Sequence, residues 1–309
     1  MIKYSIIIIT YNQKQILEKT LRSLSKQIKT PKIFEIVIAD DCSTDNTDKF
    51  VKNARVPVFF KYFRSDKNIG RSEIRNLAFE KTVGKNVIFI DGDMVPSDNM
   101  IESYLKSWDK YPGAVIAGGW EDPADFKNDP LHKYLVSRGR FRFGEECKIP
   151  SEYFTSGNFS INRDLFREMN GFDPDFEGWK GEDTDFGIRL EKKSVPIVYN
   201  PNALAVHFHK RTLSDVLSDY DRYGRSSFKV LLNKYPNIAI FEKGWILGFP
   251  DSNISFFKKI LRTLVVPAQS GLALGLLKRL AGKSGKLPFA FMYSWLFYGT
   301  MARSYKQSL

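Results

Sequence analysis

Residues 86–93 read Asn-Val-Ile-Phe-Ile-Asp-Gly-Asp, an apolar run that ends in two carboxylates one residue apart. A continuous β-branched and aromatic run of this length is typical of a strand that is buried on both faces of a sheet. Asp-Gly pairs are also common in ordinary turns. The rest of the sequence therefore has to decide whether these two carboxylates belong to a site.

Runs of the same kind occur elsewhere in the chain, and polar residues follow them. Residues 4–10 are followed by Tyr11, and residues 35–39 are followed by Asp40 and Asp41. Further strands are expected at residues 58–63 and 114–117.

Helices are expected between these strands, from apolar residues at helical spacing. Their expected ranges are 13–28, 41–54, 71–82 and 97–110. In the third of these helices, Ile74, Leu77 and Ala78 are expected to face the sheet. Strands that alternate with helices predict an α/β fold with a mostly parallel open sheet flanked by helices. Ligands of such sheets bind beyond the carboxyl ends of the strands, where the polar residues would collect.

The composition fits one large globular domain or two smaller ones. The chain has 309 residues, and 43% of them are hydrophobic. Its two cysteines, Cys42 and Cys147, exclude a disulfide framework and favour a reducing compartment. The apolar run near the N-terminus is too short for a signal peptide, so the body is expected in the cytoplasm.

Positive charge is concentrated near the C-terminus. The chain carries 47 Lys and Arg against 35 Asp and Glu, a formal net charge of +12. Residues 254–309 contain no acidic residue, and their basic residues are Lys258, Lys259, Arg262, Lys278, Arg279, Lys283, Lys286, Arg303 and Lys306. The remainder of the chain is nearly neutral, whereas a nucleic-acid enzyme would more often gather basic residues around its working groove. Nucleic acid is therefore not expected as a partner.

The same tail is also apolar. Apolar side chains between residues 256 and 265 share one helical face and basic residues share the other, as in a helix that lies in a membrane interface. Two uncharged runs, 263–277 and 287–302, are shorter than the ~20 residues that span a bilayer. The second run is rich in aromatic residues, which favour the interface. We expect the tail to hold the protein on an anionic membrane surface; a helical pair packed on the domain, or a contact between copies, is the alternative.

The strand ends offer two kinds of binding group. Asp91 and Asp93 could grip a divalent cation, because carboxylate oxygens suit such ions, which keep positions open for phosphate oxygens. Asp41 could accept hydrogen bonds from a base or a ribose, or could cap the following helix. The chain lacks Gly-x-Gly-x-x-Gly and Gly-Lys-Ser/Thr patterns after its first strand, which disfavours dinucleotide oxidoreductases and P-loop enzymes.

Residues 178–186 read Gly-Trp-Lys-Gly-Glu-Asp-Thr-Asp-Phe. Acidic residues at a helix start are favoured by the helix dipole, but that role does not require Trp179 between two glycines. An aromatic platform for a pyranose ring, followed by a carboxylate that takes a proton from a hydroxyl, suits a sugar site. The small residues at 156–158 could line the same cavity.

Two of the three histidines, His207 and His209, follow a short expected strand at residues 203–206. Neutral imidazole is a good ligand for Mn²⁺-like ions beside carboxylates. Neighbouring histidines in a strand are more often structural, but the Asp-x-Asp pattern upstream favours one of them as a metal ligand. His207 is the preferred candidate.

Several motifs occur in an order that resembles a known family. They are Ser-Ile-Ile-Ile-Ile-Thr-Tyr-Asn at 5–12, Ile-Val-Ile-Ala-Asp-Asp-Cys-Ser-Thr-Asp at 36–45, Asn-Ile-Gly-Arg from 68 with Arg75 and Asn76, and Phe-Ile-Asp-Gly-Asp at 89–93. Together they resemble the family 2 glycosyltransferases of the GT-A fold. Residues 170–175 and 178–185 further resemble the C-terminal half of galactosyl- and N-acetylgalactosaminyltransferases. The resemblance runs from about residue 3 to 210.

This resemblance implies a GT-A domain at residues 1–250, with a nucleotide-binding half at 1–120 and an acceptor-binding half at 121–250. The basic amphipathic helical tail at 251–309 lies outside it. The implied donor-binding residues are Thr10, Tyr11, Asp41, Arg71, Asp91 and Asp93. The implied sugar-contacting residues are Trp179 and Glu182, the catalytic base of inverting enzymes is Asp183, and the metal ligands are Asp93 and His207.

The implied reaction is a single inverting transfer. A nucleotide-sugar, of UDP type, would give its sugar to a hydroxyl of a glycan or lipid-linked saccharide, with Mn²⁺ or Mg²⁺ as cofactor. Lys180 departs from the family pattern, where glycine is common, and the Gln-x-x-Arg-Trp pattern of processive synthases is absent. The alternatives are a nucleotidyltransferase, which would need a Gly-rich basic loop that residues 10–19 do not offer, and a non-catalytic protein that binds nucleic acid or membranes through its tail.

Overall fold

The computed structural model describes residues 2–126, 128–137, 143–176, 178–236, 271–281 and 290–309. The chain forms two compact units. The first contains Met1–Asp125, Val136–Pro174 and Glu182–His209, and the second contains Phe126–Leu135, Asp175–Gly181 and Lys210–Leu309. The sequence suggests a nucleotide-binding half at 1–120, an acceptor-binding half at 121–250 and a tail from 251. This functional division stays a prediction. The amphipathic segment expected at 256–265 lies outside the described residues.

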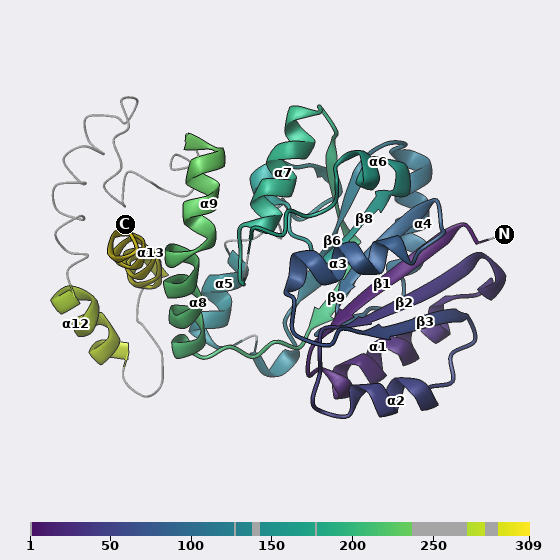
Figure 1. The fold of residues 1–309 in the computed structure, drawn as a ribbon, viewed down its shortest axis with the longest axis horizontal. Helices are drawn as coiled ribbons and strands as arrows, with labels where there is room; N and C mark the ends of the chain where they lie inside the picture. Colours follow the sequence, from purple (N-terminus) through teal and green to yellow (C-terminus); the bar gives the residue numbers. More distant parts are fainter. Residues whose placement is uncertain (1, 127, 138–142, 177, 237–270, 282–289) are drawn as a thin grey trace. The chain divides into compact units, whose positions relative to one another are not determined.

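One curled sheet forms the centre of the first unit (Figure 1). Its strands are β1 (Tyr4–Thr10), β2 (Phe34–Asp40), β3 (Phe59–Arg64), β4 (Asn86–Asp91), β5 (Met94–Pro96), β6 (Val115–Glu121), β7 (Cys147–Lys148), β8 (Asn158–Asn162) and β9 (Ile197–His207). The strand order is β3-β2-β1-β4-β8-β6-β9-β5, and β7 pairs with β9. The pairs that join β3, β2, β1 and β4 are parallel, so these strands bring their carboxyl ends to one edge.

Helices flank both faces of this sheet (Figure 1). They are α1 (Lys14–Gln27), α2 (Thr47–Asn53), α3 (Arg71–Glu80), α4 (Met100–Lys110), α6 (Arg163–Glu168) and α7 (Glu182–Lys192). The isoleucines of β1 alternate between the faces: Ile6 and Ile8 join the core cluster of α1 and α4, and Ile7 and Ile9 join that of α3 and α7. Full burial of one such side chain contributes about 1.5–3 kcal/mol, so the pattern fixes the register of the strand. The expected fold class is confirmed.

The sheet is more mixed than expected, because β8 runs antiparallel between β4 and β6. This five-residue strand is flanked by polar residues and was not among the expected strands. It matters for the site because the N–H of Asp91 donates to the carbonyl oxygen of Gly157 across 2.9 Å. The inserted strand thus brings residues 156–158 beside the end of β4.

One expectation about α3 is wrong. Leu77 was expected to face the sheet, but it is 42% exposed, whereas Arg75 is 1% exposed and lies inward. Ile74, Ala78 and Phe79 complete the buried face of this helix. A buried arginine is tolerated only where its charge is paired, and the edge of the sheet supplies the partners, as described below.

The described helices of the second unit are α8 (Leu213–Arg225), α9 (Ser227–Lys234), α12 (Gly271–Ala281) and α13 (Ala290–Gln307), and α5 (Pro130–Ser137) begins in this unit. Thr212 and Asp215 form a reciprocal capping box at the start of α8. Aromatic side chains pack α13 on α8, with the rings of Tyr220 and Phe297 stacked at 5.1 Å between centroids. Within the described parts of the chain, no helix is long and apolar enough to cross a bilayer.

This packing bears on the two readings of the aromatic run at 287–302. For its described residues, the structure agrees with the alternative of a packed helical pair, because α12 and α13 contact each other and α13 contacts α8. Tyr293, Leu296 and Phe297 are buried. These side chains are therefore used inside the protein and are not free to enter a membrane interface.

Candidate active site

Three carboxylates converge on Arg75 at the carboxyl edge of the sheet. The Nη2 atom of Arg75 lies 2.7 Å from Asp91 Oδ1, and its Nη1 atom lies 3.6 Å from Glu182 Oε1. The ring of Phe172 lies 5.4 Å from the guanidinium carbon. The backbone N–H of Ser156 donates to Asp183 Oδ1 across 3.1 Å. The buried guanidinium of Arg75 thus joins the end of β4 to the start of α7. The Ser156 N–H links the segment before β8 to the same cluster.

The charge balance of this cluster makes proton uptake easier. Burial raises the pKa of Glu182 to about 7, assisted by the neighbouring Asp183 and opposed by Arg75 and Arg71. Burial also raises the pKa of Asp183, although Arg75 and the hydrogen bond from Ser156 partly offset it. A carboxylate with a raised pKa is a better proton acceptor near neutral pH. The pair can therefore perform acid–base chemistry.

A second cluster contains Asp93, His207 and His209. Asp93 Oδ2 lies 3.3 Å from His207 Nε2 and 3.0 Å from His209 Nδ1. Strand pairing produces this arrangement: Met94 lies opposite His207 in the antiparallel pair of β5 and β9. One ligand atom from each of the three residues lies within 4.8 Å of the others, as a metal site requires. His207 was the preferred candidate from the sequence, and the structure brings both histidines to Asp93.

The electrostatics and the free atoms of this cluster fit a divalent cation. Burial would raise the pKa of Asp93, but the histidines outweigh it and hold that pKa well below its usual range. Burial would lower the pKa of His207, but the attraction of Asp93 outweighs it and the net shift is upward. Asp93 Oδ1 is buried and accepts no hydrogen bond. One carboxylate and two imidazoles form a donor set that first-row divalent metal ions accept.

The predicted nucleoside-binding residues lie at the ends of β1 and β2 and the start of α3. Thr10 is buried, Tyr11 is half exposed and Arg71 is exposed. Asp41 accepts hydrogen bonds from the N–H groups of Ile69 and Gly70, at 2.8 and 3.0 Å. Its carboxylate therefore anchors the loop that leads into α3.

Buried polar atoms without a hydrogen-bond partner gather at this same edge. In the described part of the first unit they are Thr10 Oγ1, Ser72 Oγ, Arg75 Nε and Nη1, Asp93 Oδ1 and Glu182 Oε2. Such a group costs about 1–3 kcal/mol when it is left unsatisfied, so a cluster of them indicates where a polar ligand belongs. Ser72 was not among the expected site residues, and Arg75 was noted only in a family motif, without a role. One signal in the sequence could have identified Arg75. It is a basic residue near the expected buried side of a helix, and an acidic residue ends a neighbouring strand.

Trp179 belongs to the second unit. The guanidinium carbon of Arg211 lies 4.9 Å from its ring centroid, and Tyr220 meets it edge-on at 5.2 Å. Lys180 has a φ of 71°, in the left-handed region, and its Nζ lies 4.9 Å from the ring centroid of Tyr223. Lys180, which occupies the family's glycine position, thus has a backbone conformation typical of glycine. Its side chain packs on an aromatic ring of α8.

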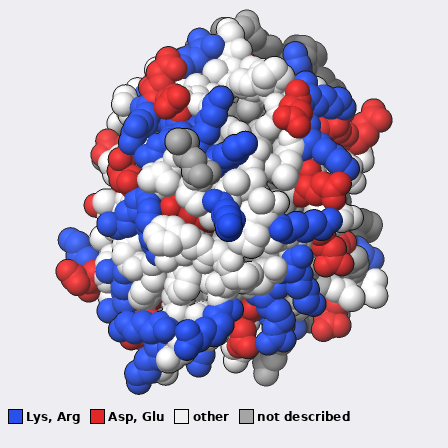
Figure 2. Space-filling view, turned by 90° about the vertical axis from the view of Figure 1, so that its right-hand side faces the viewer, with Lys and Arg blue, Asp and Glu red and all other residues white. Residues whose placement is uncertain are grey.

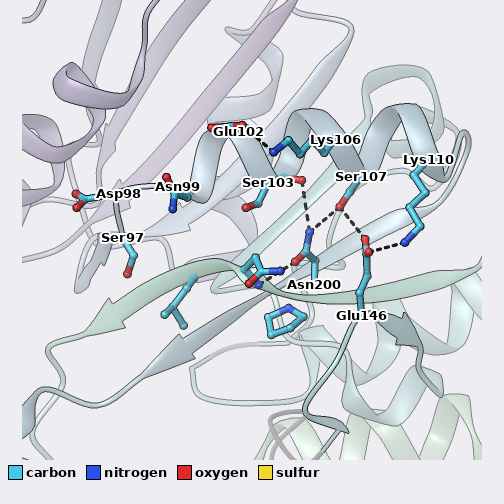
Figure 3. A pocket seen from close by; sticks show the side chains of 13 residues that line it. Ser97, Asp98, Asn99, Glu102, Ser103, Lys106, Ser107, Lys110, Glu146 and Asn200 are labelled. Atoms are coloured by element: carbon cyan, nitrogen blue, oxygen red, sulfur yellow. Dashed lines mark hydrogen bonds and ion pairs between the residues drawn. The ribbon is translucent and has the colours of Figure 1, made fainter.

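A cavity of about 610 Å³ lies elsewhere in the first unit, along α4 and β9 (Figure 3). Its polar groups already bond to one another: Asn200 Nδ2 donates to Ser107 Oγ across 2.7 Å, and Glu146 accepts from Ser107 and Lys110. None of the predicted site residues lines it. The unsatisfied atoms, rather than this cavity, mark the candidate active site.

The chain matches two families of known proteins. Residues 5–169 match glycosyl transferase family 2, and residues 141–211 match the family described as N-terminal domain of galactosyltransferase. The chain is 26% identical over 256 residues to validoxylamine A glucosyltransferase of Streptomyces hygroscopicus subsp. limoneus, covering 72% of this chain and 56% of that protein. It is 29% identical over 235 residues to chondroitin synthase of Pasteurella multocida (strain Pm70), covering 66% of this chain and 24% of that protein. The chain thus spans about half or less of these two relatives.

Solved structures show the same fold at low identity. S. aureus TarS 1-349 in complex with UDP has a TM-score of 0.57 and 19% identity, covering 100% of this chain and 92% of that chain. The mannosyltransferase PcManGT from Pyrobaculum calidifontis, in complex with GDP-Man and Mn²⁺, has a TM-score of 0.62 and 16% identity, covering 99% and 86%. The match to the first family covers more than half of the chain and includes the ends of β1, β2 and β4. The chain therefore belongs to glycosyl transferase family 2.

Proposed function

We propose that this glycosyltransferase is metal-dependent and inverting, and that it moves a sugar from a UDP-type nucleotide-sugar to a hydroxyl of a glycan or lipid-linked saccharide. The observation that carries the proposal is the cluster of unsatisfied buried polar atoms at the edge where Asp91, Asp93 and Glu182 meet. Structural neighbours crystallised with UDP, UDP-GlcNAc, or GDP-Man and Mn²⁺ support the donor class. Synthesis of a polysaccharide or glycoconjugate is the corresponding cellular role.

Asp93, His207 and His209 would hold Mn²⁺ or Mg²⁺ through the carboxylate and imidazole groups that now contact one another. When bound, the ion supplies charge neutralisation for the nucleoside diphosphate that leaves. Asp91 pairs with Arg75, and this ion pair would hold its carboxylate in place for hydrogen bonding to the ribose. The metal ligand Asp93 and the proposed ribose-binding residue Asp91 would thus lie in the same turn after β4.

Asp183 would act as the catalytic base. Its Oδ1 accepts a hydrogen bond from the Ser156 N–H, which would hold the carboxylate in place to accept the proton of the acceptor hydroxyl. The raised pKa of Asp183 favours this acceptance. Attack from the face opposite the leaving group inverts the anomeric configuration, so a single carboxylate base suffices without a covalent intermediate.

The remaining residues would bind the two substrates. Thr10 and Tyr11 would contact the nucleoside, and Asp41 would face the base while it anchors residues 69 and 70, because a carboxylate has about four acceptor sites. Arg71, exposed at the start of α3, would attract the diphosphate. Glu182 would contact the sugar, and with its raised pKa it can donate as well as accept a hydrogen bond. Trp179 would contact the acceptor or the sugar.

The protein would work as a peripheral protein on the cytoplasmic side of a membrane, where a lipid-linked acceptor is available. The basis is the charge distribution along the chain: residues 254–309 are basic and acid-free. The face drawn in Figure 2 instead carries Lys and Arg interspersed with Asp and Glu. Acid-free basic segments favour the anionic cytoplasmic leaflet.

A nucleotide-sugar screen tests the proposed function. UDP- and GDP-sugars are incubated with the protein, with and without Mn²⁺, and thermal stabilisation and released products are measured. The proposal expects stabilisation by one or a few donors, and release of a nucleoside diphosphate that depends on the metal. Release of pyrophosphate would instead identify a nucleotidyltransferase. Absence of both binding and release across the panel would contradict the proposal.

A further inference from the structure

A bulge in β9 forms one wall of the cavity along α4. Gly118 of β6 lies opposite Asn200 of β9. Two residues further along β6, Trp120 lies opposite Ala205. Four residues of β9, 201–204, therefore stand against a single residue of β6. Bulges of this kind are enriched next to functional sites, where they redirect side chains.

α4 and the residue before it supply the facing wall (Figure 3). The side chains of this wall recur at intervals of three or four residues, so they share one face of the helix. They are Asn99, Glu102, Ser103, Lys106, Ser107 and Lys110. The volume of about 610 Å³ lies within the range of about 300–1,000 Å³ that is usual for small-molecule sites.

Not all polar groups of the cavity take part in the hydrogen bonds described above. Ser103 is 8% exposed and lines the cavity, and its Oγ has no hydrogen-bond partner among the described residues. The side-chain amides of Asn99 and Asn202 also have no partner there, and Asn99 makes no capping bond to α4. Because buried hydroxyls are normally hydrogen-bonded, the partner of Ser103 has to come from what fills the cavity.

The charges of the cavity disfavour an anionic ligand. Three carboxylates and two lysines belong to the described lining, which gives it a formal charge of −1. Lys106 Nζ lies 2.7 Å from Glu102 Oε1, and Lys110 Nζ lies 2.8 Å from Glu146 Oε2. Both cations of this lining are thus paired within it. A phosphate or a uronate would meet net negative charge.

The remaining groups suit an uncharged ligand that is rich in hydroxyls. Side-chain amides and hydroxyls both donate and accept hydrogen bonds, as sugar hydroxyls do. Pro201 and Leu204 are the apolar side chains of the described lining, and no aromatic ring belongs to it. This composition favours a saccharide over an apolar ligand, and it predicts binding through hydrogen bonds alone.

The cavity adjoins the two strands that carry the metal cluster. Met94 of β5 lies opposite His207 of β9. Beyond the other end of this pair, the N–H of Ser97 donates to the carbonyl oxygen of Leu204 across 2.9 Å, and both residues line the cavity. Ser97 follows Asp93 by four residues, roughly 13 Å of extended chain. An acceptor glycan of a few sugars is long enough to extend over this distance.

We propose that the cavity between α4 and the β9 bulge binds an uncharged saccharide segment, through Asn99, Ser103 and Asn202, and that this segment belongs to the acceptor glycan. The inference rests on the proposed function for the class of the acceptor. The cavity itself requires neither the metal nor the donor. The two can therefore fail separately in experiments on the same protein.

The test measures saccharide binding by the full chain, with a chelator present and without nucleotide. Cellotetraose, maltotetraose and chitotetraose are titrated by saturation-transfer difference NMR. We expect one or more of them to bind with a Kd on the order of 1 mM. A galacturonate tetramer should bind at least about threefold more weakly, because of the charge of the lining.

The variant Asn99→Ala/Ser103→Ala/Asn202→Ala should weaken this binding at least about tenfold, because it removes three hydrogen-bonding groups. The double variant Asn99→Ala/Asn202→Ala alters only exposed residues and should show part of the effect, whatever the fate of the buried Ser103. Asn53→Ala, at the exposed end of α2 and outside the cavity, is the matched control and should bind like the wild type. Circular dichroism checks that each variant is folded.

The length of the sugar distinguishes a glycan from a free sugar. Glucose and N-acetylglucosamine are titrated beside the tetrasaccharides. A site for a glycan segment should bind the tetrasaccharide at least about fivefold more tightly, because several sugar units share the hydrogen-bonding groups of the two walls.

Three outcomes would overturn the inference. The first is a wild type that binds none of the neutral tetrasaccharides. The second is equal binding by the wild type and the triple variant. The third is a monosaccharide that binds as tightly as the tetrasaccharide, which would assign the cavity to a free sugar. Saccharide binding that requires the cavity residues, in a protein that releases no nucleoside diphosphate from any donor, would instead contradict the proposed function alone.

Discussion

Arg75 on α3 and Asp91 at the end of β4 form a buried ion pair, with 2.7 Å between Nη2 and Oδ1. Removal of one partner of such a pair leaves an uncompensated charge. Arg75→Met should therefore lower the free energy of unfolding by about 3–5 kcal/mol, measured by urea denaturation. Arg75→Lys keeps the charge and should recover part of this loss. A lysine ammonium cannot reproduce the geometry with which the guanidinium contacts both Asp91 and Glu182.

A matched control for this loss is Arg22→Met. Arg22 is exposed on α1, and its ion-pair partner among the described residues is Glu18, one turn away. The free energy of unfolding should change by less than about 0.5 kcal/mol. Equal effects of the two Arg→Met substitutions would show that the buried pair has no special role.

Mn²⁺ should raise the thermal midpoint of the wild type through the cluster of Asp93, His207 and His209, because a ligand that binds only the folded state stabilises it. His207→Ala or His209→Ala should weaken Mn²⁺ binding by at least about tenfold. Arg22→Met, an exposed substitution on α1 outside this cluster, should leave the Mn²⁺ affinity unchanged. Isothermal titration calorimetry gives the three affinities. If His209→Ala binds Mn²⁺ as the wild type does, only Asp93 and His207 remain as candidate ligands.

Stability should fall as the pH rises from about 4.5 to 7 because of Glu182. Its pKa is about 7 in the folded protein against an ordinary value of 4.5, so the folded state holds a proton that the unfolded state has lost in this range. By linkage, ionisation of Glu182 then opposes folding, by about 3 kcal/mol at pH 8. Glu182→Gln removes this titration.

Urea denaturation at several pH values, with a chelator present, checks this prediction. The stability difference between Glu182→Gln and the wild type should grow in favour of the variant between pH 5 and 8, in the window set by the two pKa values. Parallel stability curves for the two proteins would contradict the assigned shift.

The turn between Asp91 and Asp93 should not accept a side chain. A Cβ on Gly92 would lie 2.6 Å from the carbonyl oxygen of Ile9, so Gly92→Ala must push β1 and the turn apart. We expect a loss of about 2 kcal/mol in unfolding free energy together with weaker Mn²⁺ binding. Gly275→Ala is the control, because a Cβ there meets nothing within 4 Å and alanine favours the helix. A variant at Gly92 with native stability and native Mn²⁺ affinity would argue against this tight approach.

The parallel half of the sheet and its polar strand ends could be predicted from the sequence, because β1, β2 and β4 are continuous apolar runs that stop at polar residues. β8 was missed: its five residues alternate polar and apolar, as in a half-buried strand, but so short a run is weak evidence, and only the sheet partners place it between β4 and β6. The inward position of Arg75 was missed for a related reason. Helical spacing favours leucine on a buried face, and only the carboxylates of β4 and α7 make a buried arginine stable there.

The tail shows the same limit. Its apolar and basic pattern suited both a membrane interface and a packed helix, because the two differ only in what covers the apolar face. Tyr220 of α8 supplies a ring against Phe297 and decides the question for α13. The local sequence of residues 287–302 does not predict the contact with Tyr220, which lies more than 60 residues away along the chain.

The central claim is that Asp183 takes the proton of the acceptor hydroxyl. Asp183→Asn tests it most directly, because the amide oxygen can still accept the hydrogen bond from Ser156 but the side chain can no longer act as a base. Asp164→Asn, in the exposed first turn of α6, is the matched control. With the donor that the screen identifies, the account predicts that Asp183→Asn lowers sugar transfer by at least about 10²-fold while nucleotide and Mn²⁺ affinities stay within about twofold. Transfer by Asp183→Asn at the wild-type rate would contradict it.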